Sequence, residues 1–214
     1  MTASAEEHTL RECAFGPLRI AFDDRVLEPR AWTVMQSEWA AELAPELPPG
    51  PILELFAGAG HIGLLASVLT DRPLVQVEAD AVAADFAARN GARAGIADRV
   101  EVRCARVDDA LDQEERFTLI VADPPYLPSA EIGRFPADPV RAIDGGNDGL
   151  VLVRATLDVL TIHMTSGGNC LLQLAGPGQV ESTRRLVDDG WPVLTVAASR
   201  SIDTERAVAL VTRR

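Results

Sequence analysis

The sequence has few cysteines, few histidines and no long hydrophobic run, and each shortage excludes a class of protein. The cysteines Cys13, Cys104 and Cys170 lie far apart, so we expect reduced thiols, the last two buried in strands. The three histidines are scattered and make no metal-binding pattern. No apolar run reaches the ~18 residues of a membrane helix, and Met1–Leu10 lacks the features of a signal peptide. These shortages predict a cytoplasmic protein without a zinc site or a membrane segment.

Positive charge is also scarce. Lys and Arg number 20 against 32 Asp and Glu, which gives a net charge of −12 and a pI of about 4.7. Nucleic-acid binding depends on Lys and Arg that neutralise phosphates, and here basic residues cluster only in short pairs such as Arg184-Arg185. We therefore expect a protein or small-molecule partner and no strong binding of nucleic acid.

Apolar runs and turn residues divide the 214 residues into one α/β domain, residues 50–214, and a small N-terminal part. Residues 1–14 are expected to be flexible. Residues 15–49 are expected to form a hairpin, with strands 18–22 and 25–27, and an amphipathic helix over 31–44. Strand and helix then alternate, which predicts a doubly wound, mostly parallel sheet. Its seven strands are expected at 52–56, 74–78, 100–104, 117–123, 169–174, 193–196 and 207–211.

The apolar run Phe117–Ala122 ends at Asp123-Pro124-Pro125-Tyr126, because neither proline can continue a strand. This predicts a rigid corner at the carboxyl end of a strand, where open α/β sheets bind their ligands. The carboxylate of Asp123 and the carbonyl of Pro124 can accept the hydrogens of a planar nitrogen, while Tyr126 covers its flat side. The alternative interpretation is a strand followed by a proline-rich loop.

A glycine motif follows the first strand of the α/β domain. Gly58, Gly60 and Gly63 form G-x-G-x-x-G between a strand and a helix, where backbone N–H groups can approach a ligand. Glu78 ends the next strand, where it can accept both hydroxyls of a ribose. This spacing fits a nicotinamide dinucleotide as well as S-adenosylmethionine. Glu54 favours S-adenosylmethionine, because a carboxylate there can face ammonium and sulfonium charges and would repel a pyrophosphate.

The chain resembles the class I S-adenosylmethionine-dependent methyltransferases that modify planar or amide nitrogens. The resemblance lies in Glu54-Leu-Phe-Ala-Gly-Ala-Gly60, Glu78 and Asp123-Pro-Pro-Tyr126. This resemblance implies a Rossmann-like fold. More narrowly, the chain resembles the HemK-type protein-glutamine methyltransferases, which methylate the glutamine of a Gly-Gly-Gln motif in peptide-release factors. The segments 28–33, 142–150 and 176–179 are similar to further motifs of that family, and the resemblance covers roughly residues 15–214.

The resemblance also implies roles for single residues. It places S-adenosylmethionine against Glu54, Phe56, Gly58, Gly60, Glu78, Ala79, Asp108 and Asp123. It assigns catalysis to Asp123, Pro124 and Tyr126, and substrate binding to Arg30, Pro125, Tyr126 and Asp144. The chain departs from the family at Asp123, where the family has Asn, and at Arg106, where it has an acidic residue for the adenine amine. Asp108 or a backbone carbonyl is expected to replace that acidic residue.

These observations predict an N-methyltransferase that acts on the side-chain amide of a protein glutamine, with a peptide-release factor as one candidate partner. Aspartate at position 123 is common in related enzymes that methylate exocyclic amines of nucleobases. An exocyclic amine of RNA, DNA or a small metabolite is therefore the alternative substrate. A third alternative, from another class of protein, is a non-catalytic subunit with the cofactor-binding fold.

Overall fold

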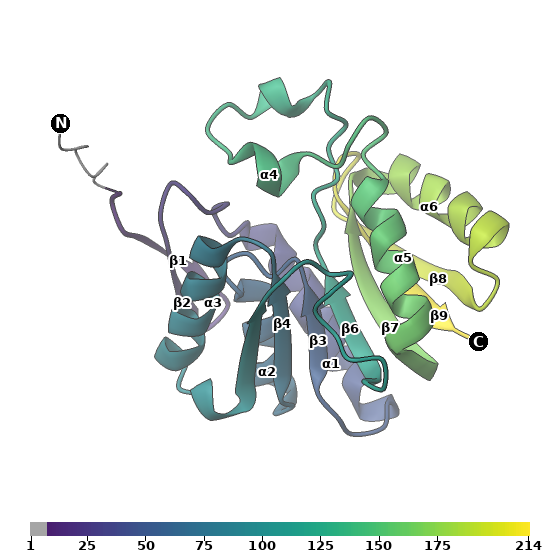
Figure 1. Ribbon diagram of the computed structural model, residues 1–214, viewed down its shortest axis with the longest axis horizontal. Coiled ribbons are helices and arrows are strands. Elements are labelled where there is room, and N and C mark those ends of the chain that lie inside the picture. The colour runs from purple at the N-terminus through teal and green to yellow at the C-terminus, as the bar shows by residue number, and fades with distance from the viewer. Residues whose placement is uncertain (1–7) are drawn as a thin grey trace.

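Residues 8–214 are described by a computed structural model, shown in Figure 1. Its centre is a seven-stranded sheet with the strand order β5-β4-β3-β6-β7-β9-β8. The strands are β3 (Ile52–Leu55), β4 (Leu74–Glu78), β5 (Val100–Cys104), β6 (Phe117–Ala122), β7 (Met164–Leu174), β8 (Leu194–Ser201) and β9 (Ala207–Arg213). β9 pairs antiparallel with β7 and β8, and the remaining neighbours pair in parallel. The predicted doubly wound, mostly parallel, Rossmann-like sheet is confirmed.

Helices cover both faces of this sheet, as buried side chains divide into two clusters. On one face lie α1 (Val34–Leu43), α2 (His61–Thr70) and α3 (Ala81–Arg93). On the other face lie α5 (Val151–His163) and α6 (Gly176–Gly190). The short elements are η1 (Ala31–Thr33), η2 (Ala44–Glu46), η3 (Ala97–Arg99), η4 (Ile132–Arg134) and α4 (Val140–Ile143). In the part of the chain described, none of the helices is long and apolar enough to cross a bilayer.

The N-terminal hairpin differs from the prediction. Its strands are β1 (Arg11–Phe15) and β2 (Leu18–Phe22), joined at Gly16, whose φ of 55° suits glycine. Residues 25–27 form no strand, because Asp23 accepts hydrogen bonds from the backbone and the guanidinium of Arg25 and so turns the chain. The predicted flexible segment is also too long: part of it forms β1, while residues 1–7 lie outside the described part.

The hairpin and α1 pack against the main sheet. Phe15, Phe22 and Trp39 belong to the same buried cluster as residues of β3 and β6. Gln36 of α1 is fully buried, and its side-chain amide donates to the carbonyls of Ala122 (3.1 Å) and Leu171 (2.8 Å). The N-terminal elements therefore brace the strands that lead to the predicted site.

The segment between β6 and α5 arches over the end of the sheet and carries α4, at the top of Figure 1. Leu127 donates to the carbonyl of Ile143 and accepts from Gly145, so the two ends of the arch are joined.

One prediction for the strands is wrong: Cys104 is exposed, whereas Cys170 is buried as expected.

Candidate functional site

A cavity of about 350 Å³ opens at the carboxyl ends of β3, β4 and β6. Its wall includes the loop between β3 and α2, the end of β4 and the corner after β6. Residues 106–108, the start of α5 and two segments distant in sequence, residues 25–27 and Arg141–Ala142, also contribute to the wall. Seven of the predicted site residues line this cavity: Phe56, Gly58, Glu78, Ala79, Asp108, Asp123 and Pro125. Glu54, Gly60, Arg30, Pro124, Tyr126 and Asp144 are not among the residues that line it.

The glycines of the loop serve different purposes. Gly58 has a φ of 55°, and a Cβ atom there would meet nothing within 4 Å, so its backbone is open to the cavity. Gly60 instead allows close packing inside the protein, because a Cβ atom there would lie 2.7 Å from Nε2 of Gln76. Gly58 thus leaves open space beside its backbone at the cavity, and Gly60 lets the loop pack closely on β4 and α3.

Glu78 closes the end of β4 and faces the cavity. Its Oε2 accepts the N–H of Gly58 and its Oε1 accepts the N–H of Asp80, each at 2.8 Å. Burial raises the pKa of this carboxyl, and the two hydrogen bonds oppose that change. Each carboxylate oxygen keeps a second lone pair, so the side chain is held rigidly and can still accept hydroxyl groups.

Glu54 lies beneath the glycine loop, not in the cavity. Its Oε1 accepts a hydrogen bond from the N–H of Gly63 at 2.8 Å, and its Oε2 accepts one from Nε2 of Gln76 at 2.5 Å. The free N–H of the first turn of α2 attracts this carboxylate, since helix starts carry unpaired donors. Glu54 therefore does not line the cavity, and its direct contact with a ligand stays a prediction. Burial raises the pKa of Glu54 to about 7, and the charge of Asp123 adds to the rise.

Asp123 ends β6 and presents its carboxylate to the cavity. Its backbone N–H donates to the carbonyl of Leu55 at 3.4 Å, which ties the corner to β3. No side chain or backbone group in the described part of the chain donates a hydrogen bond to the carboxylate. Burial without such partners raises the pKa of Asp123 to about 7. The corner therefore holds an acceptor whose lone pairs remain available.

Tyr126 lies next to this acceptor but outside the wall of the cavity. Burial raises the pKa of its phenol, and the negative charge of Asp123 raises it further. The positive charges of Arg30 and Arg206 act in the opposite direction and lower it. Arg30 is held by Asp138, with 2.6 and 2.8 Å from Nη2 to the two carboxylate oxygens. The roles of Arg30 and Tyr126 in substrate binding stay predictions.

Two other predicted residues have partners within the protein. The Oδ1 atom of Asp144 accepts from the hydroxyl of Ser129 at 2.7 Å and from the N–H of Gly146 at 2.9 Å, and these bonds lower the pKa of Asp144. The carboxylate of Asp144 therefore joins two parts of the arch to each other.

Asp108 pairs with Arg106 through two contacts of 3.0 Å at the exposed rim of the cavity. The position predicted to bind the adenine amine therefore carries both an acidic residue, Asp108, and a basic one, Arg106.

Sequence reasoning missed the residues that cover the cavity. Arg141 forms an ion pair with Asp80, whose carboxylate also caps the N-terminus of α3. The cap could have been predicted, because Asp directly before an alanine-rich helix is a standard signal. No sequence pattern predicts the position of Arg141.

His61 also lines the cavity, edge-on to Phe15, and burial lowers its pKa to about 3, so the ring is neutral.

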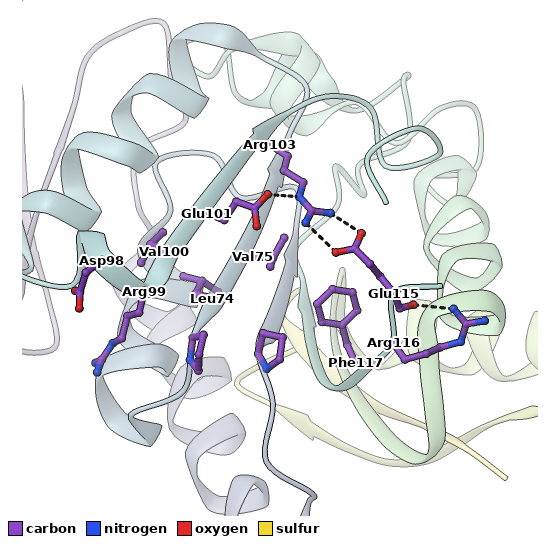
Figure 2. Close-up of a pocket in the computed structure, with 12 residues that line it drawn as sticks. Leu74, Val75, Asp98, Arg99, Val100, Glu101, Arg103, Glu115, Arg116 and Phe117 are labelled. Atoms are coloured by element: carbon purple, nitrogen blue, oxygen red, sulfur yellow. Dashed lines mark hydrogen bonds and ion pairs between the residues drawn. The ribbon is translucent and has the colours of Figure 1, made fainter. Parts of the chain in front are cut away.

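A second depression, of about 550 Å³, lies at the opposite ends of the strands (Figure 2). Arg103 crosses it between Glu101 and Glu115, and both oxygens of Glu115 accept from its guanidinium, at 2.7 and 2.8 Å. These contacts join β5 to the segment that leads into β6. Arg103 and the two glutamates neutralise one another here, whereas the cavity at the carboxyl ends contains the unpaired carboxylate of Asp123 and is the better candidate for a ligand site.

The sequence of the chain is similar to those of several glutamine methyltransferases. It is 30% identical over 192 residues to a release factor glutamine methyltransferase from Mycolicibacterium smegmatis, covering 86% of this chain and 66% of the relative. It is 30% identical over 199 residues to a ribosomal protein uL3 glutamine methyltransferase from Bradyrhizobium diazoefficiens, covering 87% and 60%. The chain spans between about half and two thirds of the length of such relatives. No family model matches it.

Solved structures share its fold. A ribosomal protein L11 methylase from Lactobacillus delbrueckii subsp. bulgaricus superimposes with a TM-score of 0.65 at 13% identity, covering 88% of this chain and 82% of that one. TYW2 from P. horikoshii, in complex with MeSAdo, gives a TM-score of 0.65 at 13% identity, covering 96% and 71%. At these identities the likeness concerns the fold alone.

Proposed function

We propose that this chain, which has the fold of the class I methyltransferases and a sequence similar to those of glutamine methyltransferases, methylates the side-chain amide of a protein glutamine. The methyl donor in this proposal is S-adenosylmethionine. The observation that carries it is the corner after β6, where the unpaired carboxylate of Asp123 faces the cavity that Glu78 and Gly58 line. A cytoplasmic location remains a prediction from the sequence.

The residues of the cavity fit S-adenosylmethionine. Gly58 leaves open space beside its backbone, and Glu78, held by the N–H groups of Gly58 and Asp80, keeps lone pairs free for the ribose hydroxyls. Three carboxyl groups, of Glu54, Glu78 and Asp123, lie at this end of the sheet, and burial raises the pKa of each. A cationic ligand relieves their mutual repulsion, whereas a pyrophosphate would add to it. When bound, the cofactor supplies an electrophilic methyl group.

The corner acts mainly by positioning. An amide nitrogen is a poor nucleophile because its lone pair is delocalised into the carbonyl. Asp123 and the carbonyl of Pro124 accept its two hydrogens, which returns electron density to nitrogen, and the ring of Tyr126 packs on its plane. Hydrogen bonds to charged groups contribute about 1.5–3 kcal/mol each. Holding both reactants in line contributes roughly 7–11 kcal/mol, so orientation is the larger effect.

Methyl transfer to the amide nitrogen leaves one proton to be removed. Asp123 is placed to take it, because a carboxyl with a pKa of about 7 is ionised in half of the molecules at neutral pH. The proton then leaves to water through the cavity. For an amide, the required task of Asp123 is to accept a hydrogen bond before the transfer, because an N-protonated amide is a strong acid and can also lose its proton directly to water.

The exocyclic amine of a nucleobase or metabolite is a second candidate substrate, and one observation favours it. A carboxylate at position 123 adds a negative charge where the glutamine methyltransferases have a neutral amide, and an amine becomes cationic as it is methylated. The net charge of −12 opposes a nucleic-acid partner but not a small molecule.

Labelled S-adenosylmethionine and a fractionated cell lysate separate these substrates. We expect label in the protein fraction, in acid-stable form, and none when the Asp123→Ala variant replaces the wild type. Label confined to RNA, DNA or metabolites would refute the glutamine proposal. A catalytically silent wild type that binds the cofactor would favour the non-catalytic alternative.

A further inference from the structure

The side chain of Gln179 lies behind the corner, on the first turn of α6, and touches Tyr126 from outside the cavity. Its Nε2 donates to the carbonyl of Tyr126 at 3.0 Å and to the carbonyl of Gly149 at 3.1 Å. Its Oε1 accepts the N–H of Ala175 at 2.7 Å. Two acceptors and one donor surround the amide, so its orientation is determined by its partners.

Glycines bring the arch against the same residue. A Cβ atom on Gly145 would lie 2.7 Å from the carbonyl oxygen of Pro125 and 2.8 Å from Cα of Tyr126. Gly149 has a φ of +70°, and a Cβ atom there would collide with the carbonyl oxygen of Tyr126. The arch therefore lies directly on the backbone of the corner, and Gln179 joins the two through their carbonyls.

We infer that Gln179 is a positioning residue that fixes the orientation of Tyr126 for the acceptor. This inference rests on the proposed function, since it assigns the Tyr126 ring to the acceptor nitrogen. Gln179 holds the carbonyl of Tyr126 toward α6 and Gly145 lies against its Cα, so the backbone direction from which the ring projects is fixed. Without Gln179, the Tyr126 carbonyl loses its hydrogen bond, and its peptide plane is held only by the Leu127 N–H on the carbonyl of Ile143, so the ring gains freedom to move.

The role is distinct from holding the arch together. The arch keeps its own bonds without Gln179: Leu127 to Ile143 at 3.0 Å, Gly145 to Leu127 at 2.8 Å, and Ser129 to Gly146 at 2.9 Å. Loss of Gln179 should therefore leave the fold in place and loosen Tyr126. The side chain does not line the cavity and is not expected to contact cofactor or substrate.

Tyr126 is the single tyrosine of the sequence, so 3-fluorotyrosine places one ¹⁹F probe at the corner. The Gln179→Glu variant keeps the length of the side chain and the acceptor for Ala175 but loses both donors. Gln179→Met removes all three bonds without adding charge. Ser182→Ala, on the same helix and bonded only to the carbonyl of Gly178, is the matched control.

We expect one sharp resonance in the wild type and in Ser182→Ala, and a shifted or broadened one in both Gln179 variants. Single-turnover methyl transfer should fall about 10²-fold in these variants, because a displacement of about 1 Å costs that much. Cofactor affinity should stay within about 2-fold. Folded variants with the wild-type resonance and turnover would overturn the inference. The resonance needs no substrate, so a wild type that methylates no protein would refute the proposed function and leave this test standing.

Discussion

The buried carboxyl groups of Glu54 and Asp123 should make cofactor binding release protons. Burial raises the pKa of each to about 7, so at pH 7 each is protonated in about half of the molecules. A positive charge within about 4–6 Å lowers a carboxyl pKa by roughly 1–3 pH units. Asp123 faces the cavity and should ionise almost fully, which releases about 0.5 proton. Glu54 lies beneath the loop and should add a smaller amount.

The demethylated product, S-adenosylhomocysteine, isolates the sulfonium. It has the same ribose, ammonium and carboxylate groups but carries no charge on sulfur. Calorimetric titrations at pH 7 in buffers of different ionisation enthalpy give the number of protons released with each ligand. We expect clearly more protons with S-adenosylmethionine than with the product, and a loss of most of this difference in Asp123→Asn. Equal proton release with both ligands in the wild type would refute the electrostatic account of the cavity.

Three further predictions follow from the same groups. Glu78→Ala should weaken cofactor binding by around 1–3 kcal/mol in calorimetry, because the ribose loses its buried acceptor; unchanged affinity would contradict that role. Asp123→Ala should lower turnover about 10²–10³-fold, while Asp123→Asn keeps substantial activity on an amide but fails on an amine. The raised pKa values of Glu54 and Asp123 cost stability as pH rises through about 4 to 7, so the ligand-free protein should melt higher at pH 6 than at pH 8. Asp123→Asn should reduce this difference, and a difference of equal size in that variant would exclude Asp123 as its source.

The central strands could be predicted from the sequence, because both faces of β3 and β6 are buried and their residues are mostly apolar. The N-terminal hairpin is harder to predict from the sequence. β1 is mostly exposed, so its residues carry little hydrophobic pattern, while the apolar Val26 and Leu27 face the cavity instead of forming a strand. The pair Gly16-Pro17, which joins β1 to β2, is a usable sequence signal for the turn of this hairpin.

The candidate site was predicted in part for a similar reason. Strand ends locate Glu78 and Asp123, because a carboxyl end of the sheet is where a parallel fold places its ligand. The direction of Glu54 depends on Gly63 and Gln76, two partners contributed by other elements, and no local pattern reveals which of them captures the carboxylate. The contacts of Gln179 and Arg141 likewise arise only when distant segments fold together.

The central claim is tested most directly by mass spectrometry of a peptide-release factor domain that contains the Gly-Gly-Gln motif, after incubation with the purified protein and S-adenosylmethionine. A matched domain with Asn in place of that Gln controls for other acceptors. The account predicts a gain of one methyl group on the glutamine side chain, absent from the Asn domain and from reactions with Asp123→Ala. If the glutamine stays unmodified while a nucleobase or metabolite amine is methylated, the chain is an amine methyltransferase and the glutamine proposal is wrong.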